Sequence, residues 1–182
     1  MAGSLVQEFL EAQDPTTATP ESPPIHRLQQ WCPPDENIFK ANFDAALFKE
    51  ENLAGLGVVI RDWRGEAIGA LTTSVPLAQT VVELEALACR RAVQFAKEIG
   101  LTQVIFEGDS LSVIQEIREG SLDALPYGHV IEDIRFQALE FQKSVFTHVP
   151  RICNVVVDAL AKKAKTYRGT QFWLEDLPKD IG

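Results

Sequence analysis

Apolar and polar side chains alternate along residues 39–47, with phenylalanine and alanine on one side and lysine, asparagine and aspartate on the other. An alternation with a period of two residues predicts a β-strand. Residues 56–63 form a second, mostly apolar stretch, Arg64 and Gly65 supply a tight turn, and residues 66–74 return. This pattern predicts a β-hairpin directly after the first strand.

Further along the chain, helical and strand patterns take turns. Helices are predicted at residues 80–99, 110–119, 128–141 and 154–166, and strands at residues 101–107 and 144–149. The resulting order is β-β-β-α-β-α-α-β-α. Because a hairpin precedes the β-α crossovers, the order predicts a mixed sheet flanked by helices, and it excludes a simple doubly wound parallel sheet.

The N-terminal stretch differs from the rest in composition. Residues 11–24 are rich in proline, threonine, serine, alanine and acidic residues, which predicts disorder. Residues 4–12 are compatible with one short helical turn. We therefore expect a disordered tail over residues 1–30, a folded domain over residues 31–173, and a C-terminal tail over residues 174–182.

The composition limits the classes of function. The 182 residues are 46 % hydrophobic, enough for the core of one domain, and no apolar run approaches the ~20 residues of a membrane span. The net charge of −9 has the wrong sign for a protein that holds nucleic acid by bulk electrostatics. Residues 1–26 contain no lysine or arginine, so neither a secretory nor an organellar leader fits, and we expect the cytoplasm or nucleus. Cys89 and Cys153, inside predicted helices, are interpreted as small core residues.

Four acidic residues stand where the pattern favours an apolar residue, or at the mouth of an apolar element: Asp44, Glu85, Asp109 and Asp158. Hard divalent cations prefer oxygen ligands, so a metal site built from these residues needs no cysteine or histidine. If the four side chains converge, the expected chemistry is metal-assisted hydrolysis of a phosphodiester.

Each of the four acids also has an ordinary structural explanation. Asp44 could belong to a solvated strand face, and Glu85 could be a glutamate at the core edge paired with a base. Asp109 could simply cap the helix that follows it. Asp158 could form a helix-surface pair with Lys162.

Helical periodicity separates Glu85 from its neighbour Glu83. The positions four, seven and eleven residues after Glu85 hold cysteine and alanine, whereas the same positions after Glu83 hold leucine, arginine and glutamine. Glu85 is therefore expected to face inward, and Glu83 to lie on the wet side of the helix, paired with Arg90 or Lys97.

Five stretches of the chain match a known family in order: KANFDAALF, AGLGVVIRDWRGEAIGA, VVELEALACRRAVQFAKEIGL, VIFEGDSLSVIQEI and HVPRICNVVVDALAKKA. On these residues the chain resembles type 1 ribonuclease H domains. Within them it is most similar to the plant subgroup found at the ends of non-LTR reverse transcriptases and as free-standing proteins. The resemblance covers residues 31–173.

The resemblance implies an α/β, ribonuclease H-like fold with a five-stranded mixed sheet in the order 3-2-1-4-5, flanked by helices. It implies four catalytic and metal-binding carboxylates, which correspond to Asp44, Glu85, Asp109 and Asp158. The implied activity is cleavage of the RNA strand of RNA–DNA hybrids with two Mg²⁺ ions about 4 Å apart, Mn²⁺ being a possible substitute. We expect a monomer that binds the hybrid and no membrane.

The chain departs from the family pattern at three places. Many members carry a mobile-loop histidine just before the last helix, but residues 150–153 here read Pro-Arg-Ile-Cys, and His148 comes earlier. The basic protrusion that some members use to grip the hybrid is missing. The usual Asp-Gly of the first strand is Asp44-Ala45.

Candidate nucleic-acid contacts lie late in the chain: Arg151, Asn154, Lys162, Lys163 and Lys165. The basic residues among them could form a local phosphate-binding surface or only a solvated helix face. Asn154, together with the backbone amides of residues 45–47, could contact the 2′-hydroxyl groups that distinguish RNA from DNA.

Two other functions remain open from the sequence. One is a non-catalytic module derived from a retroelement that binds nucleic acid or protein, which the charge of −9 and the missing grip elements favour. The other is a 3′–5′ exonuclease on the same general fold. Such enzymes begin with Asp-x-Glu on the first strand, whereas this chain has Asp44-Ala45-Ala46.

Overall fold

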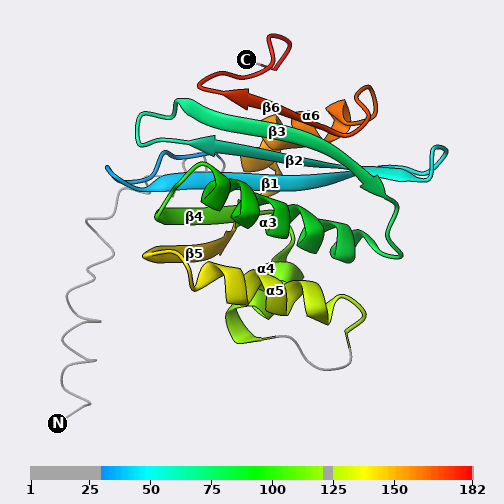
Figure 1. Cartoon of the computed structure of the whole chain (residues 1–182), viewed down its shortest axis with the longest axis horizontal. Helices are drawn as coiled ribbons and strands as arrows, with labels where there is room; N and C mark the ends of the chain where they lie inside the picture. The colour runs from blue at the N-terminus through cyan, green and yellow to red at the C-terminus, as the bar shows by residue number, and fades with distance from the viewer. Residues whose placement is uncertain (1–29, 121–124, 182) are drawn as a thin grey trace, which may run out of the picture. The chain divides into compact units, whose positions relative to one another are not determined.

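The computed structural model of the chain describes residues 30–120 and 125–181. Nearly all of the predicted N-terminal tail, with the helical turn proposed at residues 4–12, lies outside them. Within the described residues, helices cover both faces of one β-sheet (Figure 1). None of these helices is long and apolar enough to cross a membrane.

The sheet has six strands in the order β5-β4-β1-β2-β3-β6. Their bounds are β1 Phe39–Phe48, β2 Leu53–Arg61, β3 Ala67–Pro76, β4 Gln103–Gly108, β5 Lys143–His148 and β6 Thr170–Leu174. β1 runs antiparallel to β2 and parallel to β4, so the sheet is mixed. The predicted order 3-2-1-4-5 is confirmed for the first five strands.

The sixth strand, β6, is an addition that the sequence pattern did not predict. It pairs antiparallel with β3 at the sheet edge, and the hydroxyl groups of Thr73 and Thr170 lie 2.7 Å apart across the pair. Its five residues, TQFWL, are too few to show a clear period of two. Beyond it, where a tail was expected, Leu177 and Ile181 pack against buried residues of the sheet and the last helix.

The helices follow the predicted order, with one change near the end of the chain. They are α3 Val81–Glu98, α4 Leu111–Glu119, α5 Gly128–Ala138 and α6 Val155–Lys163, and the 3₁₀ turn η1 Arg151–Asn154 precedes α6. The predicted last helix at residues 154–166 is therefore too long. After Lys163 the N–H groups of Lys165 and Thr166 bind carbonyls three residues back, which ends the helix in a tight turn.

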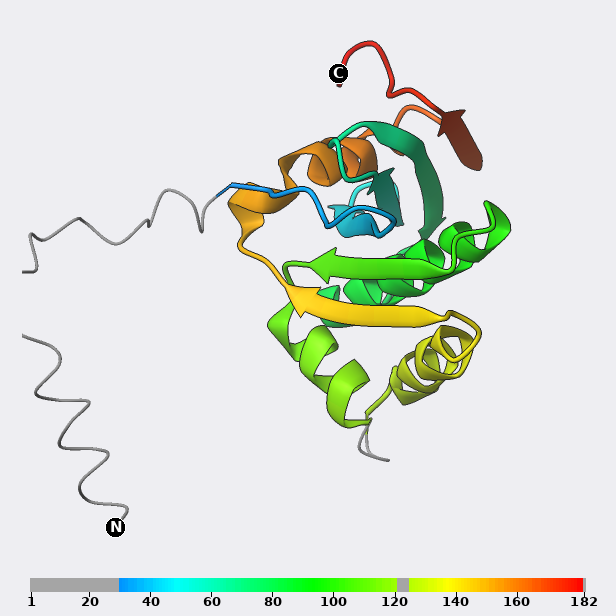
Figure 2. The same ribbon diagram turned by 90° about the vertical axis from the view of Figure 1, so that its left-hand side faces the viewer.

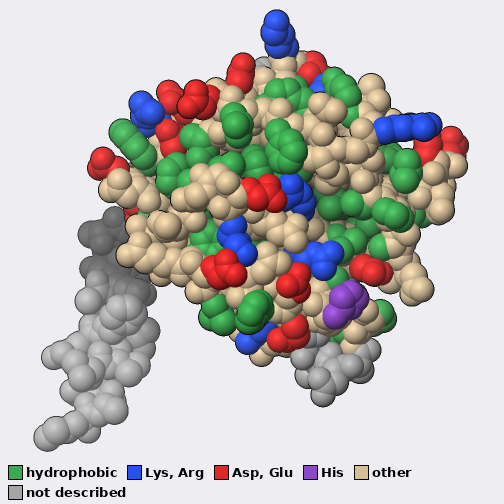
Figure 3. All heavy atoms as spheres, viewed as in Figure 1, with side chains coloured by type: hydrophobic (Ala, Val, Ile, Leu, Met, Phe, Trp, Pro, Cys, Tyr) green, Lys and Arg blue, Asp and Glu red, His purple; other side chains and the backbone are tan. Residues whose placement is uncertain are grey.

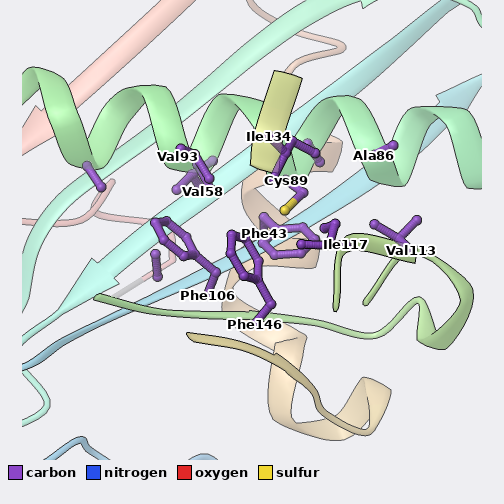
Figure 4. Close-up of a cluster of buried hydrophobic side chains, with 14 of the residues drawn as sticks. Phe43, Val58, Ala86, Cys89, Val93, Phe106, Val113, Ile117, Ile134 and Phe146 are labelled. Atoms are coloured by element: carbon purple, nitrogen blue, oxygen red, sulfur yellow. The ribbon is translucent and has the colours of Figure 1, made fainter. Parts of the chain in front are cut away.

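One face of the sheet packs against α3 through large apolar side chains. Figure 4 shows Phe43, Phe106 and Phe146 of three strands gathered beneath Cys89 of α3. The rings of Phe106 and Phe146 stack with their centroids 5.1 Å apart. Cys89 and Cys153 are both buried, as predicted for small core residues. This dense layer holds α3 firmly against β1.

The opposite face packs against α6, which approaches the sheet unusually closely. Figure 2 shows α6, in orange, on the other side of β1 from α3. The approach is possible because Gly55 and Gly57 of β2 have no side chain: a Cβ atom at Gly57 would lie 2.5 Å from the carbonyl oxygen of Val157 and 2.6 Å from the nitrogen of Ala161. Gly57 pairs with Asp44 of β1, so this contact brings α6 close to Asp44.

We predict that Gly57→Ala destabilises the protein by roughly 1–3 kcal/mol, because the added methyl group meets backbone atoms of α6 that cannot move independently. Gly69→Ala is the matched control in β3. Its Cβ would lie 3.0 Å from the ring of Phe95, a side chain and not a backbone atom, so the contact is less severe. Thermal unfolding measures both, and equal melting temperatures for the two variants would contradict the explanation.

Candidate metal centre

Three carboxylates that lie far apart in the sequence meet at one point of the fold. Oxygen atoms of Asp44, Glu85 and Asp109 all lie within 4.8 Å of one another. Asp44 comes from β1, Glu85 from the second turn of α3, and Asp109 from the residue after β4. β1 and β4 are parallel neighbours, with Asn42 paired to Glu107, so the residues two positions further on, Asp44 and Asp109, reach the same level of the sheet.

Asp44 and Glu85 are both buried inside this site. Asp44 is only 2 % exposed, so its interpretation as part of a solvated strand face is wrong, since α6 covers that face. Glu85 is 6 % exposed, and among the described residues no basic side chain forms an ion pair with it. A structural pairing of Glu85 with a base is therefore not observed.

The helix phase derived from the sequence agrees with the structure. Glu85 points into the protein, whereas Glu83 is partly exposed. The expected partners of Glu83 are engaged elsewhere: Arg90 lies 3.6 Å from Asp133, and Lys97 lies 2.7 Å from Glu140. The predicted pairing of Glu83 with either base is wrong, because α5 and the turn after it supply closer carboxylates.

Two buried oxygen atoms of the site receive no hydrogen bond from any N–H or hydroxyl group of the described residues, and a proton shared between the two carboxyl groups is the one donor at hand. They are Asp44 Oδ2 and Glu85 Oε2, while Asp44 Oδ1 accepts a bond of 2.9 Å from the N–H of Ala45. A buried carboxylate oxygen without a partner is unfavourable, and nearly all such atoms in proteins are satisfied in some way. Oxygen atoms gathered in this manner fit a divalent cation, so the donor set is compatible with metal binding.

The same crowding raises the pKa of both buried acids. Burial, followed by the nearby charge of Asp109, raises the pKa of Asp44 to about 6. Burial, followed by the charge of Asp44, raises the pKa of Glu85 to about 10. Like charges and loss of water both disfavour the ionised forms. Without a cation, the pair therefore keeps a proton near neutral pH.

Asp158 lies outside this group of three. Its Oδ2 accepts a hydrogen bond of 2.8 Å from Lys162, one turn further along α6, and its side chain is 26 % exposed. The helix-surface pair considered from the sequence is thus present. The charge of Asp158 nevertheless contributes to raising the pKa of Asp44, so the fourth carboxylate lies at the rim of the site.

Asp109 faces a basic side chain and does not serve only as a helix cap. Arg151 Nε lies 3.9 Å from Asp109 Oδ2, and the Arg151 side chain is 85 % exposed. Helix α4 begins behind Ser110, which makes no capping bond through its side chain. His148 Nε2 lies 3.2 Å from the carbonyl oxygen of Asp109, so this histidine is also next to the site.

Two hollows flank the carboxylates, and Arg151 borders both. The first, about 390 Å³, is lined by Val81, Val82, Glu85, Asp109, Ser110 and Arg151. The second, about 410 Å³, is lined by residues 45–48, Arg151, Asp158, Lys162 and Lys165. The second hollow has three basic side chains and one acid, Asp158, in its lining, and the basic side chains are suitable groups for the phosphates of a phosphodiester chain.

Two of the residues expected to contact nucleic acid do not face this hollow. Asn154 is 1 % exposed, and its amide group binds Asn42 and the carbonyl oxygen of Phe43. Lys163 is tied to Asp180 at 2.6 Å. These assignments need correction because the sequence pattern shows neither the η1 turn nor the return of the C-terminal segment onto α6. Of the residues expected to contact nucleic acid, Arg151, Lys162 and Lys165 line the hollow.

Acidic and basic side chains are mixed over the visible surface. Figure 3 shows them interspersed on the face seen in Figure 1, and the described residues form no broad basic patch on that face. With a net charge of −9, any attraction to a polyanion has to be local.

Comparison with known families assigns the chain to a class. The model of the family described as reverse transcriptase-like matches residues 42–164, and the chain belongs to this family. A search among curated protein sequences gave no match.

Solved structures of ribonucleases H share the fold. Ribonuclease H1 from the halophilic archaeon Halobacterium salinarum is 26 % identical with a TM-score of 0.65, over 71 % of this chain and 98 % of that one. LC11-RNase H1, isolated from compost, is similar in its complex with an RNA/DNA hybrid, at 22 % identity and a TM-score of 0.62, over 69 % and 95 %. The foamy viral protease-reverse transcriptase, also bound to a hybrid, is 17 % identical with a TM-score of 0.57, over 84 % and 22 %. The fold is therefore α/β and ribonuclease H-like.

We predict that Asp44→Asn stabilises the metal-free protein at about pH 8. The raised pKa of Asp44 means that its contribution to stability is present below its unfolded-state pKa and is lost as the pH rises through about 6. Asparagine carries no charge to repel Asp109, so the melting temperature rises by an amount on the order of a few degrees.

The same variant separates repulsion from metal binding. Added Mg²⁺ raises the melting temperature of the wild type by binding the folded state, whereas Asp44→Asn shows no such gain. Asp35→Asn, at an exposed position, is the control and behaves as the wild type does. An unchanged melting temperature in Asp44→Asn, or a retained response to Mg²⁺, would contradict the assignment.

Proposed function

We propose that this protein is a divalent-metal-dependent endonuclease that hydrolyses the RNA strand of RNA–DNA hybrids, with Mg²⁺ as the cofactor and Mn²⁺ as a substitute. The observation that carries the proposal is the meeting of Asp44, Glu85 and Asp109 within 4.8 Å, together with the two buried oxygen atoms that receive no hydrogen bond from an N–H or hydroxyl group of the described residues. A site of this kind is unfavourable for stability alone, and a cation relieves it.

The carboxylates of the chain would hold the cations. Two divalent ions, when bound, supply an activated water and stabilise the leaving 3′ oxygen of the RNA strand. Asp44 and Glu85 offer their unpartnered oxygens from the buried side, and Asp109 offers its carboxylate from the more open side. Asp158, whose carboxylate accepts a hydrogen bond from Lys162, would be the fourth carboxylate of the set.

The hollow beside the site offers a path for the RNA strand. Residues 45–48 of β1 line it together with Arg151, Lys162 and Lys165. The basic side chains suit phosphates, and backbone groups suit the 2′-hydroxyls by which RNA differs from DNA. The complex of LC11-RNase H1 with a hybrid, on the same fold, supports this choice of substrate.

Within the reverse transcriptase-like family, we infer that the chain belongs to the plant subgroup and acts as a monomer. The quoted stretches support the subgroup, above all KANFDAALF around Asp44 and HVPRICNVVVDALAKKA around Asp158. An origin in a mobile element follows from the same resemblance.

A second candidate function is a non-catalytic module that binds nucleic acid or protein through the same fold. The observation that favours it is the pairing of Asp158 with Lys162, which occupies the fourth carboxylate, in a chain of net charge −9. Binding of hybrid without any Mg²⁺-dependent cleavage would support this alternative.

The direct test of the proposed function is cleavage of an RNA–DNA hybrid with Mg²⁺, using duplex DNA and duplex RNA as controls. We predict that Glu85→Gln lowers kcat by about 100-fold or more, because it removes a charge that holds the cation, whereas Glu83→Gln, two positions away on the same helix, changes kcat by less than about 2-fold. If Glu83→Gln were the inactive variant, the site would have been placed on the wrong face of α3.

The hollow yields a separate prediction about affinity. Replacing Arg151, Lys162 and Lys165 together by glutamine should weaken hybrid binding about 10-fold or more at low salt, and should reduce the salt slope by about 2–3, since each lost phosphate contact removes roughly one unit. Binding is measured by a salt titration without divalent cations, so that metal binding does not contribute.

Lys163→Gln is the control for this titration. Lys163 is on the same helix but is bound to Asp180 away from the hollow, so its replacement should leave affinity and slope nearly unchanged. Equal effects of the triple variant and of Lys163→Gln would mean that the hollow is not the path of the substrate.

A further inference from the structure

A layer of buried polar residues lies next to the carboxylates, one step earlier on each of three elements. Along β1 and along β4 with the residue after it, each member precedes a carboxylate by two positions. At the start of α6 the spacing is four positions. Both spacings keep two side chains on one face. The pairs are Asn42 with Asp44, Glu107 with Asp109, and Asn154 with Asp158. We call Asn42, Glu107 and Asn154 the polar layer.

Hydrogen bonds join the polar layer into one unit. Asn42 Nδ2 donates to Glu107 Oε2 and to Asn154 Oδ1, both at 3.0 Å. The exposed fractions are 0 % for Asn42, 5 % for Glu107 and 1 % for Asn154. One asparagine therefore ties β1 to β4 and to the residue at the start of α6. From the sequence, Asn42 was predicted only to lie on the polar face of the first strand.

Asn154 contributes a second link to β1. The parallel pairing of β1 with β4 ends at Asn42 and Glu107, and the next carbonyl oxygen of β1, that of Phe43, accepts a 2.8 Å hydrogen bond from Asn154 Nδ2. Asn154 stands at the N-terminus of α6 but makes no capping bond with its side chain. Its amide instead holds α6 to the strand residue immediately before Asp44.

The segment before β1 completes the network. Trp31 Nε1 donates to Asn42 Oδ1 at 2.9 Å, so the oxygen and the amide nitrogen of Asn42 both have partners. Lys40 Nζ lies 3.0 Å from Glu107 Oε1 and donates to the carbonyl oxygen of Cys32 at 2.6 Å, which neutralises the buried glutamate. A fully satisfied polar network in a dry interior is rigid.

We propose that the polar layer is a set of positioning residues that determines the spacing of Asp44, Asp109 and Asp158 for cation binding. Because the layer is buried, its members are not expected to contact a cation or the substrate, and they would act through the backbone of β1, β4 and α6. This inference rests on the proposed function, because the spacing matters only if these carboxylates hold metal. Supporting groups behind metal ligands commonly change affinity or activity by about 10–100-fold when they are removed.

The test compares Asn154→Ala with Thr72→Val, which is matched to it. Thr72 Oγ1 also ties the sheet to α6, through a buried 2.6 Å hydrogen bond to the carbonyl oxygen of Leu160, but from β3, a strand that carries none of the carboxylates. Mn²⁺ binding is measured on the full chain from the electron paramagnetic resonance signal of free Mn²⁺, and hybrid cleavage is measured separately.

We expect both variants to melt at a lower temperature. Only Asn154→Ala should weaken Mn²⁺ binding, by about 10-fold or more, and lower kcat to a similar degree while KM for the hybrid changes by less than about 3-fold. Trp31→Phe removes the indole N–H bond to Asn42 and keeps an aromatic ring beside Arg61 and Lys40. It should weaken Mn²⁺ binding by roughly 2–5-fold. If Asn154→Ala does not fold, the Mn²⁺ affinity of Trp31→Phe tests the proposal instead.

The outcomes separate this inference from the proposed function. Wild-type binding of Mn²⁺ with the expected loss in Asn154→Ala supports the positioning role even if no hybrid is cleaved, and in that case only the proposed activity fails. Unchanged Mn²⁺ affinity in Asn154→Ala and Trp31→Phe, or an equal loss in Thr72→Val, overturns the positioning role. A wild type that binds no Mn²⁺ at millimolar concentration overturns both.

Discussion

Three carboxylates are held close together in this structure, two of them buried, and this arrangement disfavours their ionised forms. Asp44 and Glu85 are withdrawn from water, and this burial is the main reason that their pKa values rise. The charge of Asp109 adds to the rise at Asp44, and the charge of Asp44 adds to the rise at Glu85. A flexible frame would relieve the strain by moving the side chains apart. Here the aromatic core under α3 on one side and the glycine contact with α6 on the other prevent such relaxation, so a proton or a cation has to compensate the charge.

The two helices that complete the site are held in different ways. α3 packs by apolar side chains, whereas α6 rests with its backbone against Gly55 and Gly57 and is joined to β1 by the amide of Asn154. Backbone contact and hydrogen bonds define position more sharply than apolar packing does. Asp158, the acid carried by α6, is also the one that already has a cationic partner, in Lys162.

Most of the helices and strands, and the inward phase of Glu85, followed from periodicity, because alternation in β1 and the apolar stripe of α3 are strong local signals. The order of the first five strands came from the resemblance to ribonuclease H domains. Contacts distant in sequence left no such signal. The burial of Asn154, the return of Asp180 to Lys163, and the pairing of β6 with β3 depend on where α6 and the C-terminal segment settle. Polar residues inside a strand, such as Asn42, were the one hint of the buried network.

The hydrogen bond from Trp31 to Asn42 links the segment that precedes β1 to the interior of the domain. The stretch before β1 forms neither helix nor strand, yet the indole group of Trp31 completes the hydrogen-bond network beside the carboxylates, and Arg61 lies over its ring at 4.2 Å from the centroid. A protease that nicks the chain just after Trp31 would leave the sheet and both helices intact while loosening the acids inside. Cleavage of the chain in this segment is therefore expected to disturb the spacing of the carboxylates, although none of the carboxylates is itself altered.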